Sequence, residues 1–129
     1  FNLLKGKIKN KRICFLGVTF KANTDDMRDS SSLFMIPSLI KKGAKINYFD
    51  PTGEKQDFKK IKNVNFSNNI SSAIKDSDLI IIHTEWNDFK SINFKKEVKN
   101  RNFIIFDMRN IYSSTKMKEQ KIKYFSIGC

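Results

Sequence analysis

Two nearly unbroken runs of apolar residues constrain the fold of this chain more than any other feature. Residues 13–20 are apolar at every position except Gly17 and Thr19, and residues 79–82 read Leu-Ile-Ile-Ile. A run this dense is typical of a strand that is buried on both faces, whereas a strand with one solvated face alternates apolar and polar residues. Strands buried on both faces belong mainly to parallel sheets covered by helices. The two runs therefore predict an α/β fold.

Strand-like and helix-like segments alternate along the chain. We expect strands at 13–20, 45–49, 64–66, 78–84, 103–106 and 122–126, with helical segments at 31–42, 53–62, 70–76 and 94–99. The serines at 30–32 are predicted to cap the first helix, Pro37 to bend it and Gly43 to end it. Alternating strands and helices build right-handed βαβ units. We therefore predict one doubly wound, Rossmann-like domain with a mainly parallel sheet and flanking helices over residues 1–129.

Composition and charge narrow the function. The 129 residues include 25 Lys and Arg against 13 Asp and Glu, so the formal net charge of +12 favours an anionic partner. The apolar runs are far shorter than the roughly 20 residues that span a bilayer, so we expect no membrane segment. One histidine and two cysteines without metal-ligand spacing predict no metal site. Because the lysines are dispersed without interleaved aromatic residues, we expect no nucleic-acid partner. A non-catalytic basic domain that binds nucleic acid or another polyanion stays open as the alternative.

The loop after the first predicted strand carries two cations. In parallel sheets, ligands bind outside the carboxyl ends of the strands. Lys21 stands at such an end, and Arg28 comes just before the first predicted helix. Because a helix N-terminus attracts anions, these side chains could hold a phosphate or a carboxylate. In the other interpretation, Arg28 pairs with the neighbouring aspartates and only ties the loop together.

A further cation, Arg109, follows the predicted strand at 103–106. Its forked guanidinium could hold a phosphate or a sugar hydroxyl, or it could bond to Asp107. If the two strands are neighbours in the sheet, Arg109 and Lys21 would face one crevice.

Other positions do not complete a catalytic or dinucleotide site. Residues 17–24 contain one glycine, so the G-x-G-x-x-G turn that approaches a pyrophosphate is missing, despite Asp50 after the second predicted strand. We expect Trp86 to pack as a lid over the sheet rather than to stack on a nucleotide base. We expect Glu85 to cap the next helix rather than to act as a catalytic base. Cys14 is predicted to be buried and inert. No catalytic residue is therefore assigned within this chain.

Four segments stand in a fixed order along the chain. They are Gly-Val-Thr-Phe-Lys-Ala-Asn-Thr-Asp-Asp-Met-Arg at 17–28, Gly-Ala at 43–44 with Tyr-Phe-Asp-Pro at 48–51, Thr-Glu-Trp-Asn-Asp-Phe at 84–89 and Phe-Asp-Met-Arg-Asn at 106–110. Together they resemble the C-terminal, UDP-binding domain of the UDP-glucose/GDP-mannose dehydrogenase family. The resemblance covers nearly the whole chain.

The resemblance implies part of an NAD-dependent enzyme. Family members oxidise UDP-glucose to UDP-glucuronate in two hydride transfers, for polysaccharide or glycoconjugate synthesis. An N-terminal domain holds most of the NAD, a central helical segment carries the dimer contact, and the catalytic cysteine precedes the region matched here. We therefore expect this chain, which starts at Phe1, to be a fragment of a cytoplasmic homodimer or larger oligomer. Alone it should be inactive and bind UDP weakly or not at all.

The resemblance also assigns residues. Phe20 and Lys21 match the family's substrate-binding Phe-Lys pair, Arg109 matches its later substrate-binding arginine, and Arg28 matches an arginine that reaches NAD across the interdomain cleft. Met108 departs from the glycine of many members and could narrow the loop around Arg109. Related dehydrogenases for GDP-mannose and UDP-N-acetylmannosamine share the fold, so the exact nucleotide sugar stays open, with UDP-glucose favoured.

Overall fold

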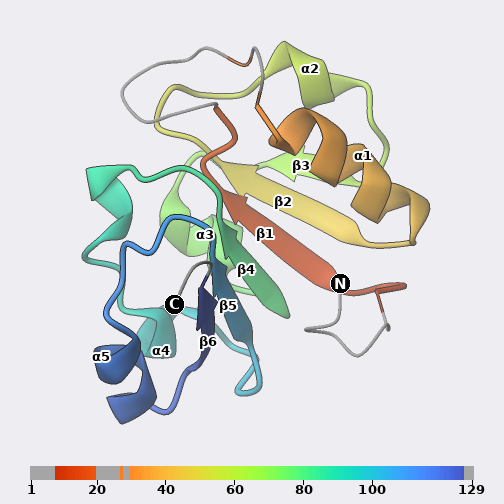
Figure 1. Ribbon diagram of the computed structural model, residues 1–129. Helices are drawn as coiled ribbons and strands as arrows, with labels where there is room; N and C mark the ends of the chain where they lie inside the picture. The colour runs from red at the N-terminus through yellow and green to blue at the C-terminus, as the bar shows by residue number, and fades with distance from the viewer. Residues whose placement is uncertain (1–7, 20–26, 28–29, 127–129) are drawn as a thin grey trace.

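The chain folds around one six-stranded sheet, shown in Figure 1. The computed structural model describes residues 8–19, 27 and 30–126. The strands are β1 (Arg12–Leu16), β2 (Lys45–Phe49), β3 (Val64–Phe66), β4 (Leu79–Ile82), β5 (Ile104–Asp107) and β6 (Lys123–Ser126). They lie in the order β3-β2-β1-β4-β5-β6, and every pairing is parallel. The predicted α/β class and parallel sheet are confirmed.

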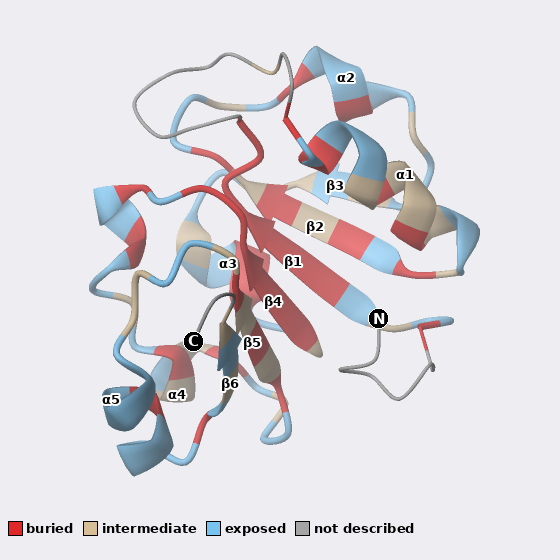
Figure 2. Cartoon of the chain, viewed as in Figure 1, coloured by how far each residue is buried: buried red, intermediate tan, exposed pale blue. Residues whose placement is uncertain are grey.

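Helices cover both faces of the sheet. They are α1 (Ser32–Lys41), α2 (Gln56–Lys59), α3 (Ile70–Ile74), the 3-10 turn η2 (Asn87–Phe89), α4 (Phe94–Glu97) and α5 (Ser114–Glu119). One core joins α1 and α2 to one face, and a second core joins α3, η2, α4 and α5 to the other. Figure 2 shows β1 and β4 as the most buried strands, at the centre of the sheet. Two covered faces explain the dense apolar runs of the sequence, and they let us expect that this chain folds on its own.

The end of α1 follows the sequence prediction. Gly43 has a φ of +93°, its N–H donates to Ile40 O at 2.9 Å, and the Ala44 N–H donates to Leu39 O at 3.1 Å. This pair of bonds is a Schellman motif, for which a residue in the left-handed region is required. α1 runs through Pro37 as a continuous helix.

Two local predictions are wrong, and one helix was not predicted. β1 ends at Leu16 rather than at residue 20, because the chain turns at Gly17, whose φ is +80°. α5 was not predicted, since Met117 is its single buried side chain and no apolar periodicity marks it. Glu85 caps no helix: it is exposed, and the N-cap position of η2 is Trp86, which makes no side-chain cap bond.

No helix among the described residues combines the length and the apolar character that crossing a bilayer requires.

Candidate functional site

The carboxyl ends of β1 and β4 approach each other unusually closely. A Cβ atom placed on Gly17 would lie 2.6 Å from the Cβ of Thr84, which follows β4. The His83 N–H donates to Leu16 O at 3.0 Å, and the Gly17 N–H donates to Phe49 O at 2.8 Å. Only a glycine fits this conformation and this spacing, so Gly17 allows the chain leaving β1 to pack directly against Thr84.

Side-chain hydrogen bonds hold the chain that leaves β1. Val18 O accepts from the hydroxyls of Ser30 at 2.5 Å and Ser32 at 2.6 Å. The Val18 N–H donates to a carboxylate oxygen of Asp50 at 2.9 Å. These bonds tie β1 to the start of α1 and to the end of β2. The serines were predicted to cap α1, and this is confirmed in part: the Ser30 hydroxyl accepts the Ser32 N–H at 3.3 Å, whereas the side chain of Ser31, at the N-cap position, makes no cap bond.

Asp50, directly after β2, is buried, and its carboxylate accepts hydrogen bonds from two neighbouring segments. Besides Val18, it accepts from the N–H of Thr52 at 2.9 Å and from the Thr52 hydroxyl. An acidic side chain at the end of a second strand can bind a ribose in dinucleotide-binding folds. Here the same position braces the turn after β2, and its described partners are protein groups.

His83, the chain's single histidine, is fully buried behind this edge. Its Nε2 lies 2.8 Å from the Ser31 hydroxyl and its Nδ1 lies 3.2 Å from the Thr84 hydroxyl. Burial, and to a smaller extent the charge of Arg109, lower the pKa of His83 to about 4, although Asp50 opposes the shift. The imidazole is therefore neutral at pH 7.

The loop after β5 presents Arg109 at the same edge. The Asp107 carboxylate is buried and accepts the N–H groups of Arg109 at 2.9 Å, Ile111 at 2.8 Å and Tyr112 at 3.1 Å. It also accepts the Tyr124 hydroxyl at 2.7 Å. One carboxylate thus shapes the whole turn, because buried backbone donors need acceptors. Burial, with the negative charge of Asp107, raises the pKa of the Tyr112 phenol.

The side chain of Arg109 is exposed, and it reaches back to β4. Its Nε donates to His83 O at 3.0 Å. The predicted bond with Asp107 exists, but through the backbone N–H of Arg109 rather than through its guanidinium. The guanidinium is thereby oriented along the carboxyl edge, the place where ligands bind in parallel sheets.

The sequence predictions for this site have mixed outcomes. Arg109 lies at the carboxyl edge as expected. The strands that precede Lys21 and Arg109 are not neighbours, because β4 lies between β1 and β5, so that condition for a shared crevice is wrong. Phe20, Lys21 and Arg28 fall outside the described residues, and the pairing of Arg28 is therefore not tested.

Two packing predictions are confirmed. Cys14 is fully buried, and burial raises the pKa of its thiol. Trp86 is 8% exposed and packs in the core on the α3 face, as a lid would; its Nε1 has no hydrogen-bond partner among the described residues.

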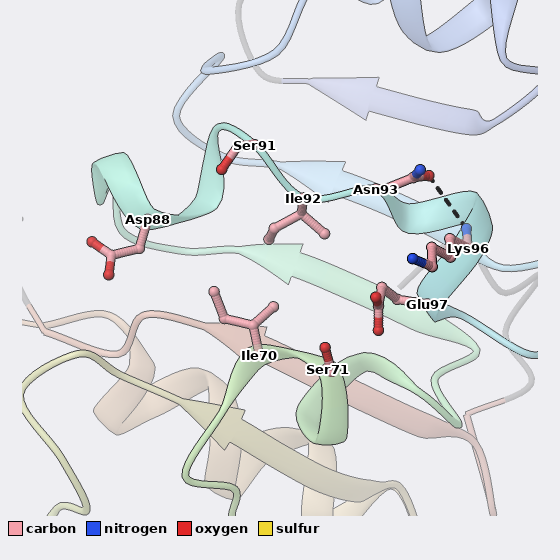
Figure 3. Close-up of a pocket in the computed structure, with 8 residues that line it drawn as sticks. All are labelled: Ile70, Ser71, Asp88, Ser91, Ile92, Asn93, Lys96 and Glu97. Atoms are coloured by element: carbon pink, nitrogen blue, oxygen red, sulfur yellow. Dashed lines mark hydrogen bonds between the residues drawn. The ribbon is translucent and has the colours of Figure 1, made fainter.

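A separate shallow pocket of about 350 Å³ lies between α3 and the segment from η2 to α4, as Figure 3 shows. Its lining residues are Ile70, Ser71, Asp88, Ser91, Ile92, Asn93, Lys96 and Glu97. Two carboxylates against one ammonium do not favour a diphosphate. In the described part of the chain, no three His, Cys, Asp or Glu side chains gather as metal ligands do.

Sequence reasoning missed the residues that support Arg109. His83, Thr84 and Asp107 carry the site's hydrogen bonds, yet none was chosen as a site residue. The available signal was their position, since each stands at or just after the end of a buried strand.

Comparisons with known proteins identify the family of this chain. The model of the UDP-glucose/GDP-mannose dehydrogenase family, UDP binding domain, matches residues 14–114. The UDP-glucose 6-dehydrogenase of Rhizobium meliloti is 34% identical over 124 residues, which are 95% of this chain and 28% of that protein. The UDP-glucose 6-dehydrogenase of Rickettsia felis is 36% identical over 129 residues, 98% of this chain and 29% of that protein.

Solved structures show the same fold. The NDP-N-acetyl-D-galactosaminuronic acid dehydrogenase of Methanosarcina mazei superposes with a TM-score of 0.82 at 23% identity, over 98% of this chain and 26% of that one. A UDP-glucose dehydrogenase of Pyrobaculum islandicum superposes with a TM-score of 0.76 at 21% identity, over 96% of this chain and 27% of that one. The chain thus spans less than a third of the length of these proteins. It belongs to the UDP-glucose/GDP-mannose dehydrogenase family and corresponds to that family's UDP-binding domain.

Proposed function

We propose that this chain is the C-terminal, UDP-sugar-binding domain of an NAD-dependent UDP-glucose dehydrogenase, which oxidises UDP-glucose to UDP-glucuronate. The observation that carries the proposal is the placement of Arg109 at the carboxyl edge by His83 O and by the turn around Asp107. Arg109 also lies inside the segment that matches the family's UDP-binding domain. The relatives named above as UDP-glucose 6-dehydrogenases favour UDP-glucose over the sugars of related enzymes.

In this proposal, the chain binds and orients the substrate. Arg109 and Lys21 neutralise the diphosphate and Phe20 completes the substrate contact, so that binding energy places C6 of the sugar for oxidation. The chain's formal charge of +12 suits an anionic nucleotide sugar. The family resemblance implies that the nucleophilic cysteine of the reaction belongs to a part of the enzyme beyond this chain; Cys14, for its part, is sealed in the core.

The described residues do not fit a complete NAD site. Asp50, the one acidic side chain at the end of β2, is engaged by Val18 and Thr52. We therefore propose that NAD, which accepts the hydride when bound, is held mainly by another domain, with Arg28 of this chain reaching it. We further propose that the complete enzyme is cytoplasmic and forms a homodimer or a larger oligomer. Its product would be used in polysaccharide synthesis.

The role of Arg109 is tested by replacing it in the complete enzyme that carries this domain. We expect Arg109→Ala to lower kcat/KM for UDP-glucose about 10- to 150-fold, which corresponds to the 1.5 to 3 kcal/mol of a charged hydrogen bond. Lys21→Ala should have a similar effect. The matched control is Arg101→Ala, because Arg101 is exposed and precedes β5, at the opposite edge of the sheet.

The outcomes separate the possible functions. Equal losses from Arg101→Ala and Arg109→Ala would mean that only the net charge matters. A wild-type enzyme that oxidises GDP-mannose or UDP-N-acetylmannosamine in preference to UDP-glucose would correct the substrate. Absence of any nucleotide-sugar oxidation, together with tight and strongly salt-dependent binding to unrelated polyanions, would replace the proposal with the polyanion-binding alternative.

A further inference from the structure

A chain of hydrogen bonds runs through the buried ring of His83. It begins at the Ser31 hydroxyl, 2.8 Å from Nε2, and continues from Nδ1 to the Thr84 hydroxyl over 3.2 Å. It ends where the Thr84 hydroxyl donates to Thr19 O at 2.9 Å. Both ring nitrogens are thus engaged, and the ring joins the start of α1 to the chain that follows β1.

The direction of these bonds fixes the tautomer. A threonine hydroxyl has one proton, and that of Thr84 goes to Thr19 O, which can only accept. The Thr84 oxygen must therefore accept from the ring, so Nδ1 carries the proton. A neutral imidazole then has a bare Nε2, which accepts from the Ser31 hydroxyl.

We propose that His83 is a positioning residue for the nucleotide-sugar site. Its ring, as the Nδ1–H tautomer, locks the start of α1 against the chain leaving β1. Its backbone, whose N–H donates to Leu16 O, presents a carbonyl that accepts the Nε–H of Arg109 and orients that guanidinium. The part of this claim that concerns the nucleotide sugar rests on the proposed function, whereas the part that concerns Arg109 does not.

The surroundings of His83 favour a neutral imidazole that still makes hydrogen bonds. His83 is 1% exposed, and the ring of Phe15 lies 6.1 Å from its own. Among the described residues, the charged groups that act on the ring are Arg109, which disfavours the imidazolium, and Asp50, which favours it. Thr19 is bonded through its carbonyl to Thr84, which follows β4, and Ser30 is bonded through its hydroxyl to Val18 O. In the sequence, Thr19 and Ser30 stand on either side of the segment that contains Phe20, Lys21 and Arg28. His83 therefore stands between Arg109 and the two ends of that segment.

The tautomer and the hold on Arg109 are tested by nitrogen NMR of the 129-residue chain at neutral pH. With one histidine in the sequence, the ring signals need no assignment. We expect a protonated Nδ1 and a bare Nε2 in the wild type, and a shift toward the Nε2–H tautomer in Thr84→Val. We also expect the Nε–H of Arg109, identified by its loss in Arg109→Lys, to exchange with water at least tenfold faster in His83→Leu. A wild-type Nε2–H tautomer, or an unchanged exchange rate, would overturn the proposal.

The effect on the substrate is tested by kinetics of the complete enzyme. We expect His83→Leu to lower kcat/KM for UDP-glucose about tenfold, mainly through KM, at temperatures well below its unfolding midpoint. His83→Gln can still accept from Ser31 and should recover most of the loss. Ser31→Ala should also lower kcat/KM for UDP-glucose. It should add little to the effect of His83→Leu, because both substitutions remove the same Ser31–His83 hydrogen bond. The control is Ser71→Ala, since Ser71 is an exposed serine of α3.

The outcomes can be told apart. If His83→Leu lowers the unfolding midpoint but leaves KM unchanged, His83 is only structural and the proposal fails. If the wild-type enzyme oxidises no nucleotide sugar, the proposed function fails, and the NMR measurements alone decide whether His83 positions Arg109.

Discussion

Replacing Gly17 with alanine is expected to destabilise the folded chain by about 2 to 5 kcal/mol. The φ of +80° costs an alanine about 1 to 2 kcal/mol, and crowding in a packed interior adds about 1 to 3 kcal/mol. The new Cβ would meet the Thr84 Cβ at 2.6 Å. Thr84 cannot move aside without loss, because it is fully buried and its hydroxyl bonds to Thr19 O. Urea unfolding of the 129-residue chain measures the difference.

Gly53 supplies the matched control. Its φ of +95° is similar to that of Gly17, but nothing lies within 4 Å of a Cβ placed there. Gly53→Ala should therefore cost only the backbone strain, about 1 to 2 kcal/mol. Equal losses at the two positions would show that the close approach of β1 and β4 contributes nothing.

The fold was predictable because its signals are local and strong. The apolar runs of β1 and β4 have one good explanation, a strand covered on both sides, and the structure contains it. Gly43 predicted the end of α1 for a similarly local reason. α5 gave no such signal, since a short helix with one buried side chain depends on tertiary packing and on the Ser113 cap.

The site was predictable only in part. Arg109 stands out from its place at a strand end, and the resemblance selects it as well. Its partner, the carbonyl of His83, lies 26 positions away in sequence, and no side-chain pattern identifies a backbone acceptor. The order of the strands was also beyond the sequence, and β4 between β1 and β5 is what places His83 between Arg109 and the chain leaving β1.

The same buried histidine makes the stability of the chain depend on pH. Because burial lowers the pKa of His83 to about 4 in the folded state, while the unfolded chain keeps a value near 6.5, the unfolded state binds more protons between these values. The free energy of unfolding is therefore complete above pH 6.5 and decreases as the pH falls toward 4. The total loss is roughly 3 kcal/mol, from a shift of about 2.5 pH units.

Urea unfolding at several pH values checks this decrease, and His83→Gln isolates it. The variant keeps every carboxylate, so the acid titration of those groups is common to both proteins and cancels in the difference. It has no imidazole to protonate, so its stability should fall less between pH 6.5 and 4, by roughly 3 kcal/mol. Parallel curves would mean that the folded protein accepts the proton readily, and the neutral Nδ1–H ring that holds Ser31 and Thr84 would then not describe His83.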